Sequence, residues 1–395
     1  MHRWDVIVMG GGISGMSFAY ASAAEGKSTL VLEKEPRLGG CIDSRHLASG
    51  FWFEMGAHTA YNSYGGLIDI LQGCGLMDRL LARAKAPFCL LRGNRIRSLM
   101  AELNFLELAI SLPRGLASRK DELSVADYYS RLVGTGNYTR VLGPFLSAVP
   151  SQTADAFPST MLFKKRPRRK NVFRSYTLAG GLSTVIDAIA RRPLVTIESG
   201  VCVASIESFS GGISVMGTDG RRREAISAAV AIPPSVAATV LENSFPELGR
   251  ALKRIGTAEV DSVGVVVPAS KLKIKPVAGL IPSRDVFFSA VSRDTVPDEH
   301  RRAFTFHFKP GLAPDARKTR IAEVLEVAHR EFETLIEKHT ILPSPVLGHS
   351  SIVSEIDRLT AGTGLCLTGN YFGGLAIEDC ITRSNQEFTR LAARL

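Results

Sequence analysis

Short apolar blocks alternate with a glycine-rich turn and a helical stretch at the start of the chain. Residues 5–9 read DVIVM, a density of β-branched side chains typical of a buried parallel strand. Four glycines fall within residues 10–15, residues 16–25 have a helical composition, and a second apolar block follows at 28–32. The pattern predicts two parallel strands joined by a tight turn and a helix.

The end of the chain repeats the order of strand, glycine loop and helix. Residues 364–368 are apolar, and glycines follow at 369, 373 and 374. Beyond them, apolar side chains recur at helical spacing, which predicts a final helix with one buried face. The side chains of this face are Ile377, Ile381, Phe388, Leu391 and Leu395.

The middle of the chain has a different character. Residues 76–182 are helical and basic, and β-rich stretches at 262–267, 286–291 and 303–308 alternate with a predicted helix near 320–338. We therefore expect an α/β fold in which a doubly wound sheet is built from the start, centre and end of the chain. A mixed sheet and a helical region are inserted into it.

Composition excludes several classes of protein. The chain has 395 residues, 45% of them apolar, which excludes a disordered tail, a disulfide-stapled miniprotein and a collagen-like rod. Its six cysteines include no C-x-x-C pair, so we expect neither a zinc site nor a redox dithiol, and no other metal. No signal peptide and no apolar run of membrane-spanning length is visible, which favours the cytoplasm.

The net charge of +10 does not by itself indicate which anionic partner the protein binds. No zinc-finger spacing, helix-turn-helix pattern or RNA-binding aromatic motif accompanies the charge, so nucleic acid is not expected. An anionic small substrate and an anionic membrane surface both fit, and the second would make the protein peripheral on the inner face of the membrane.

The first glycine turn has the spacing of a dinucleotide site. Gly10 permits the tight turn, Gly12 lets the backbone approach a pyrophosphate, and Gly15 lets the helix pack against the strand. Glu33 ends the second strand eighteen residues beyond Gly15, where a carboxylate can accept hydrogen bonds from ribose hydroxyls. The full strand–turn–helix–strand context makes this a strong prediction.

Later motifs indicate which dinucleotide is bound. Residues 37–40 (RLGG) resemble the R-x-G-G motif of the flavin amine oxidase superfamily, which implies FAD, and residues 51–58 resemble its turn beside the isoalloxazine ring. Residues 369–381 resemble the pattern G-N-Y-x-G-G-x-x-x-x-D-C-I of the protoporphyrinogen oxidase family. Matches to that family at 39–44, 53–56, 177–182, 231–234 and 343–349 follow in the same order along most of the chain.

The resemblance implies a set of FAD contacts. Catalytic residues stay unknown; His58 and His307 are candidates, and a positional role beside the flavin is the better expectation for His58. Cys41 is expected to pack beside a non-covalently held flavin. The implied cofactor-binding residues are Gly10, Gly11, Gly12, Ile13, Ser14, Gly15, Glu33, Lys34, Arg37, Gly39, Gly40, Cys41, Met55, Gly56, Ala57, His58, Val203, Gly369, Asn370, Gly374, Leu375, Ala376 and Ile377.

Two basic clusters lie in the insert. A predicted hairpin carries Arg92, Arg95 and Arg97, which could bind the propionates of a tetrapyrrole or only water. Residues 164–170 hold six basic side chains, and with an apolar anchor at 105–112 they could dock on anionic lipid. A solvated loop is the alternative for the second cluster.

The resemblance implies a function and a division of the chain. We expect oxidation of a porphyrinogen in tetrapyrrole and heme biosynthesis, with hydride passing to flavin N5 and molecular oxygen as acceptor. An amine oxidase, a desaturase and a flavin-binding protein without turnover are the alternatives. The expected segments are FAD-binding at 1–80, 171–240 and 346–395, a helical basic insert at 81–170 and a substrate-binding sheet at 241–345.

Overall fold

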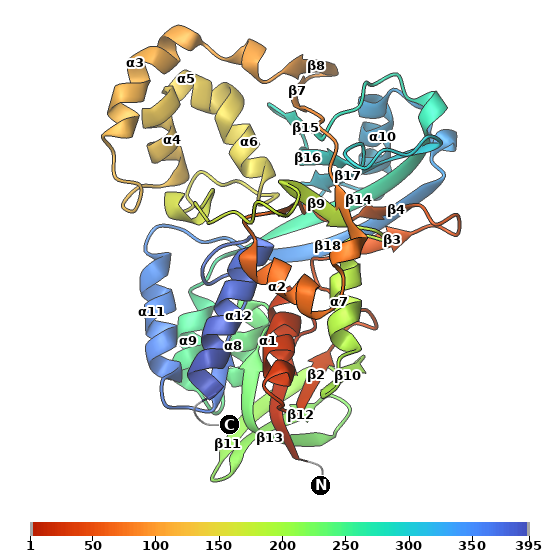
Figure 1. Cartoon of the computed structure of the whole chain (residues 1–395). Coiled ribbons are helices and arrows are strands. Elements are labelled where there is room, and N and C mark those ends of the chain that lie inside the picture. Colours follow the sequence, from red (N-terminus) through yellow and green to blue (C-terminus); the bar gives the residue numbers. More distant parts are fainter. Residues whose placement is uncertain (1–2, 393–395) are drawn as a thin grey trace.

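A seven-stranded sheet forms the lower half of the molecule in the computed structural model, which describes residues 3–392 (Figure 1). Five strands are parallel, and an antiparallel hairpin extends one edge. The strands come from three separate parts of the chain, as predicted. They are β1 (Arg3–Met9), β2 (Thr29–Glu33), β10 (Val195–Ser199), β11 (Val203–Phe209), β12 (Gly212–Gly217), β13 (Arg222–Val230) and β19 (Leu365–Leu367).

Helices cover both faces of this sheet because its central strand alternates two apolar faces. Val6 and Val8 of β1 belong to one core, and Ile7 and Met9 belong to the other. The first core is shared with α1 (Ile13–Ala24), α2 (Gly65–Gly73), α7 (Ser183–Ala190) and α12 (Ile377–Ala392). The second is shared with α8 (Pro234–Leu241), α9 (Pro246–Lys253) and α11 (His349–Thr360).

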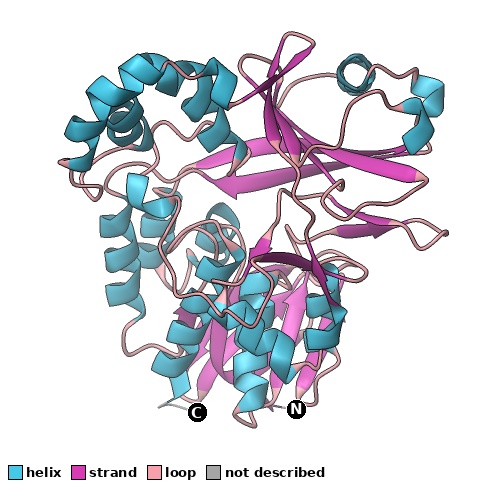
Figure 2. Ribbon diagram, turned by 45° about the horizontal axis from the view of Figure 1, so that its top comes forward, coloured by secondary structure: helices cyan, strands magenta, loops and turns pink. Residues whose placement is uncertain are grey.

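A second seven-stranded sheet spreads above the first (Figure 2). Its order is β18-β14-β17-β16-β15-β7-β8, and only β15 and β7 pair in parallel. Its outer face packs against α10 (Pro314–Leu325). The strands are β7 (Phe88–Arg92), β8 (Arg95–Ser98), β14 (Thr257–Pro268), β15 (Gly279–Pro282), β16 (Phe287–Ser292), β17 (Arg301–Phe308) and β18 (Thr334–Pro343).

The predicted helix near 320–338 is wrong in its second half. The helix ends at Leu325, and Glu326 adopts a left-handed conformation with a φ of 54°. Residues 334–343 form β18, which pairs with β14 along ten residues. Strand pairing at the edge of the sheet has overridden a charged local sequence with no strong preference.

A group of short helices stands beside the second sheet and forms the upper left of Figure 1. It comprises α3 (Phe105–Leu116), α4 (Val125–Val133), α5 (Thr135–Asn137) and α6 (Gly143–Ala148) around a small core. Two further small sheets join the halves of the molecule. One contains β3 (Ser44–His46) and β4 (Trp52–Glu54); the other contains β5 (Ala60–Tyr61), β6 (Leu80–Ala82) and β9 (Ser175–Leu178). Within residues 3–392, no helix has the length and apolar character needed to cross a bilayer.

Candidate active site

The glycines of the first turn serve two different purposes. Gly10 has a φ of +102°, and an added Cβ at Gly15 would overlap the carbonyl oxygen of Gly10, so the fold itself requires both. Gly12 has an ordinary φ of −73°, and an added Cβ there would meet nothing closer than 4.0 Å. The space beside Gly12, at the N-terminus of α1, therefore fits a pyrophosphate that must approach the backbone closely.

Glu33 lies against this turn. Its carboxylate accepts hydrogen bonds from the backbone N–H of Gly11 at 2.7 Å and of Glu35 at 3.0 Å. Each oxygen keeps a further lone pair, which suits ribose hydroxyls. The backbone N–H of Val201 donates to the backbone carbonyl of Glu33, so the segment that leads to Val203 passes beside the end of β2. The structure thus brings together the residues predicted to hold the adenosine half.

The second glycine turn closes over the first. The N–H of Gly39 donates to the carbonyl of Gly11 at 2.8 Å, and Gly12 and Gly39 form an isolated parallel bridge. The Arg37 guanidinium donates to three carbonyls of its own loop, at Leu38, Gly40 and Ile42, so it shapes the turn. Lys34, also predicted to contact the cofactor, pairs instead with Glu35 on the protein surface. The structure therefore does not bring Lys34 into the site.

A buried carboxylate that the sequence analysis did not single out fixes this turn. Asp43 is completely buried and pairs with Arg45 at 2.7 Å, Lys338 at 3.0 Å and Arg37 at 3.4 Å. Burial alone would raise the pKa of Asp43, but Lys338 and Arg37 outweigh it and lower the pKa. Lys338 also donates to the carbonyl of Gly40 at 2.8 Å, so β18 of the second sheet holds the glycine turn directly.

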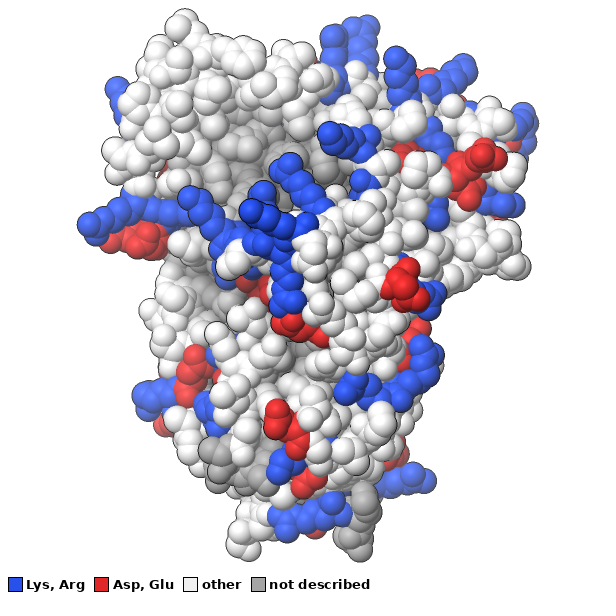
Figure 3. All heavy atoms as spheres, viewed as in Figure 1, with Lys and Arg blue, Asp and Glu red and all other residues white. Residues whose placement is uncertain are grey.

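A cavity of about 540 Å³ lies between the two halves of the molecule. One wall consists of predicted cofactor residues: Cys41, Met55, Gly56, Ala57, His58, Asn370, Leu375, Ala376 and Ile377. The facing wall belongs to the second sheet and includes Val260, Leu280 and Leu342. Lys164, Arg166 and Arg168 also line the cavity, and Lys and Arg side chains gather around the hollow at the centre of the face in Figure 3.

Two glycines of the C-terminal loop, Gly369 and Gly374, support the cofactor wall without lining the cavity. An added Cβ at Gly369 would lie 2.5 Å from the Tyr371 ring, and Gly374 has a φ of +151° beside the Asp379 carboxylate. Asp379 in turn accepts from Lys164 at 3.1 Å and Arg166 at 2.6 Å. The loop is therefore held by the basic segment 164–170, which lies far from it in sequence.

The two candidate histidines both border the cavity. His58 Nε2 lies 3.0 Å from the carbonyl oxygen of Cys41 and so donates to it, which fixes the Cys41 loop. Burial lowers the pKa of His58. Burial and the nearby His58 lower the pKa of His307 to about 3. Both imidazoles are therefore neutral near pH 7, which suits positional roles more than proton donation.

The arginines predicted to bind the substrate lie outside the cavity. The hairpin itself is present as β7 and β8, but Arg92, Arg95 and Arg97 are exposed and none of them lines the cavity. Arg92 pairs with Glu102 at 3.3 Å. The cations that do border the cavity are Lys338 and three side chains of the segment 164–170. Charge clustering alone could not identify which of the two basic clusters faces the cavity.

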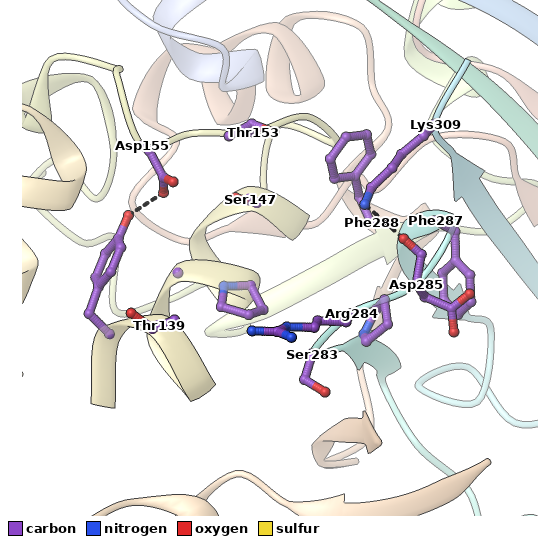
Figure 4. A pocket seen from close by; sticks show the side chains of 14 residues that line it. Thr139, Ser147, Thr153, Asp155, Ser283, Arg284, Asp285, Phe287, Phe288 and Lys309 are labelled. Carbon is purple, nitrogen blue, oxygen red and sulfur yellow. Dashed lines mark hydrogen bonds between the residues drawn. The ribbon is translucent and has the colours of Figure 1, made fainter. Parts of the chain in front are cut away.

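A second hollow, of about 230 Å³, lies on the outer side of α6 (Figure 4). Its polar groups largely satisfy one another: the Tyr138 hydroxyl donates to Asp155, and Lys309 donates to the backbone carbonyl of Asp285. None of the predicted cofactor residues lines it. The hollow is therefore separate from the candidate active site.

Fold and geometry define a two-part protein in which a dinucleotide-binding α/β half faces an inserted sheet across a cavity. The family of flavin-containing amine oxidoreductases matches residues 13–273. The chain belongs to this family. Membership confirms the predicted class, an oxidoreductase with FAD as its cofactor.

Individual relatives match shorter stretches. UDP-galactopyranose mutase from Mycoplasma pneumoniae is 37% identical over 73 residues, 18% of each chain. The 15-cis-phytoene desaturase of Narcissus pseudonarcissus is 33% identical over 76 residues, 19% of this chain and 13% of that one. Chloroplast protoporphyrinogen oxidase from Nicotiana tabacum is 28% identical over 160 residues, 37% of this chain and 29% of that one. The chain thus matches less than a third of the length of each of these relatives.

Solved structures resemble the whole chain. A provisionally assigned protoporphyrinogen oxidase from Exiguobacterium sp. 255-15 superimposes with a TM-score of 0.80 at 16% identity, covering 100% of both chains. Reduced UDP-galactopyranose mutase gives 0.77 at 13% identity, covering 99% of this chain and 96% of that one. Putrescine oxidase bound to putrescine gives 0.71 at 14% identity, covering 99% of each. At these identities the likeness establishes the fold.

The contrast between Gly12 and Gly15 gives a test of the cofactor site. We expect Gly12→Ala to fold but to bind FAD at least about tenfold more weakly, because its Cβ occupies the space of the pyrophosphate and of nothing else. Without FAD its melting temperature should equal that of FAD-stripped wild type, and a given concentration of added FAD should raise it by less than it raises the wild-type value. Gly15→Ala should fail to fold with or without FAD. Purification of Gly12→Ala with one FAD per chain would contradict the assignment.

The lowered pKa of His307 predicts a pH dependence of stability. An unfolded imidazole titrates near 6.5, so between about pH 6.5 and about pH 3 the unfolded chain binds more protons than the native one. Stability should fall as the pH drops through this window, and the fall should be smaller in His307→Gln. Urea unfolding of FAD-saturated protein measures it, with the exposed substitution His329→Gln as the surface control. If the free energy of unfolding changed with pH equally in wild type and in His307→Gln, the lowered pKa of His307 would be refuted.

Proposed function

We propose that the protein is an FAD-dependent oxidase or dehydrogenase that acts on a porphyrinogen, with molecular oxygen as final acceptor. The observation that carries the proposal is the composition of the cavity. Its predicted flavin wall faces an apolar wall, and basic side chains line one side of it. A porphyrinogen is a large apolar macrocycle with carboxylates on its rim, so both kinds of wall have a counterpart on it. The match to the tobacco protoporphyrinogen oxidase supports the same substrate class.

In this proposal the chain's own residues bind FAD and the substrate and orient them relative to each other. When bound, FAD supplies the hydride acceptor for a C–H bond next to a pyrrole. The turn at 10–15, Glu33 and Val203 hold the adenosine and pyrophosphate, while the wall from Cys41 to Ile377 holds the ring. The Asp43–Lys338 pair keeps the glycine turn fixed while the cavity fills and empties.

Lys164, Arg166 and Arg168 are the proposed partners of the substrate carboxylates. Lys164 and Arg166 share Asp379, so part of their charge is already compensated. Arg168 is exposed and forms no ion pair among residues 3–392, which leaves its guanidinium available for a carboxylate. An amine oxidase is less favoured by the same charges, because a protonated amine would meet a predominantly cationic cavity mouth.

Anaerobic mixing of the FAD-loaded protein with protoporphyrinogen or coproporphyrinogen should bleach the flavin absorbance. Arg168→Gln should raise the half-saturating porphyrinogen concentration about fivefold, the loss expected for one partly exposed charge-assisted contact. Arg95→Gln removes another exposed arginine, one outside the cavity, and should leave that concentration unchanged. If neither porphyrinogen reduces the flavin, the substrate proposal fails, and a flavin-binding protein without this turnover becomes the better description.

We also propose a peripheral contact between the helical insert and an anionic membrane. Helix α3 has a polar side chain on its inner face and apolar side chains on its outer face. The Glu107 carboxylate accepts hydrogen bonds from the backbone N–H groups of Gly136 and Asn137. The side chains of Leu106, Ile110 and Leu116 are 61–73% exposed. Residues 92–174 contain fifteen Lys and Arg against six Asp and Glu, which is +9 of the chain's +10. An apolar helix face in a cationic region fits the headgroup layer of an anionic bilayer.

Flotation with vesicles tests this contact. The protein should bind vesicles of phosphatidylcholine with phosphatidylserine more strongly than pure phosphatidylcholine, and salt should weaken the binding. Leu106→Ser combined with Ile110→Ser should lower the affinity at least about tenfold, because the helix loses its apolar anchor. Val236→Ser, at an exposed apolar site on α8, is the matched control. Equal binding of the double variant and wild type would exclude α3 as the anchor.

A further inference from the structure

Four polar side chains form one row across the second sheet. In the strand register Lys338 of β18 lies opposite Ser262 of β14, Ser262 lies opposite His307 of β17, and His307 lies opposite Ser289 of β16. Directly opposed residues of antiparallel strands point to the same face. All four side chains line the large cavity, on the wall that faces the predicted flavin wall.

The surroundings of this polar row are apolar on both faces of the sheet. On the other face of β17, Phe304, Phe306 and Phe308 pack into the apolar core under α10. On the cavity face, Val260, Leu280 and Leu342 surround the row with apolar surface. Polar groups in such surroundings are costly without hydrogen bonds, so each member of the row needs a partner.

Lys338 and Ser262 have partners inside the protein, whereas His307 and Ser289 each have one polar side-chain atom without a partner among residues 3–392. Lys338 is bound to Asp43 and Gly40, and Ser262 Oγ lies 2.9 Å from His307 Nδ1. His307 is 2% exposed and Ser289 is 3% exposed. Among residues 3–392, neither His307 Nε2 nor Ser289 Oγ has a hydrogen-bond partner.

The Ser262 contact decides which hydrogen-bonding role His307 Nε2 has. If Nδ1–H donated to Ser262, the serine proton and Nε2 would both be left without partners. If the Ser262 hydroxyl donates to Nδ1, the serine proton is used and only Nε2–H lacks a partner. The second tautomer leaves fewer buried groups unsatisfied, and the neutral state of the imidazole permits it. His307 therefore presents an N–H donor, and Ser289 beside it presents an O–H donor.

We propose that His307 and Ser289 are positioning residues that donate hydrogen bonds to an acceptor atom of the substrate, an oxygen or nitrogen carried on the part that lies against β16 and β17. The inference deepens the proposed function, on which its assignment of the cavity rests. It favours substrates with heteroatoms, such as porphyrinogens with their carboxylates, over the hydrocarbon polyenes of a desaturase. A hydrocarbon would leave both donors without a partner, whereas an acceptor atom of the substrate would satisfy them.

Two neutral probes of the same shape test the donors without turnover. 2-Acetylnaphthalene carries a carbonyl where 2-isopropenylnaphthalene carries a methylene, so only the first can accept a hydrogen bond. Neither probe is charged, so neither can form an ion pair with the cations at the cavity mouth. Their dissociation constants for the FAD-loaded protein are measured from the perturbation of the flavin spectrum and, independently, from quenching of naphthalene fluorescence.

We expect wild type to prefer the ketone over the alkene about tenfold, the effect of satisfying a buried donor. His307→Leu combined with Ser289→Ala should abolish the preference, and His307→Gln, which keeps a neutral N–H donor, should retain part of it. Thr340→Val, which removes a hydroxyl from the same cavity outside the row, should leave the ratio at the wild-type value.

Equal affinities of wild type for the two probes would overturn the inference, and so would an unchanged ratio in the double variant. The outcome is independent of the porphyrinogen test, because it measures binding of non-reacting ligands. A preference for the ketone together with no reduction by porphyrinogens would keep the two donors and reject only the substrate proposed above.

Discussion

The buried carboxylate of Asp43 is the interaction on which the active-site cavity depends. Arg37 meets it from the glycine loop, Arg45 from β3, and Lys338 from the edge strand of the second sheet. These groups come from opposite walls of the cavity, so the carboxylate fixes the walls relative to each other. Without these three cations Asp43 would be an uncompensated buried charge, which typically costs about 3–5 kcal/mol. The loop and the strand are therefore held in one arrangement.

Other long-range contacts extend the same constraint along the cavity. The Glu378 carboxylate of α12 accepts from the backbone N–H groups of Gly66 and Leu67 at the start of α2, so it caps a helix some 310 residues away in sequence. Thr305 Oγ1 of β17 donates to the carbonyl of Glu54 at 2.6 Å and ties the second sheet to the strand beside the predicted flavin wall. Polar contacts thus assemble a site from segments that are too far apart to organise one another locally.

This division between local and long-range contacts explains what the sequence could predict. The turn at 10–15, Glu33 and the final helix depend on spacing within one supersecondary unit, and the structure places them as expected. The hairpin bearing Arg92 forms as predicted, but the position of its arginines outside the cavity depends on β7 pairing with β15, nearly two hundred residues later. The predicted helix near 320–338 failed for the same reason, because β14 recruits its second half as a strand.

Lys338 and Ser289 carried no local signal at all. A lysine in an edge strand and a serine between phenylalanine and alanine are unremarkable in sequence, and only the register of four strands places them in one row. His307 was recognised as a candidate because histidine is chemically versatile, but alternation alone could not decide which face of β17 it occupies. The phenylalanines on either side decide it, since they fill the core under α10.

The placement of charge around the cavity follows from the cost of burial. Lys338 is the one cation of the polar row, and its burial is offset by Asp43. The other cations that line the cavity, Lys164, Arg166 and Arg168, lie at the mouth, where water or Asp379 can compensate them. Deeper in, the groups without partners are neutral. A neutral N–H or O–H donor without a partner costs only about 1–3 kcal/mol, far less than an isolated charge. The interior of the cavity can therefore keep specific donors ready for a substrate, while long-range attraction of an anionic substrate is left to the mouth.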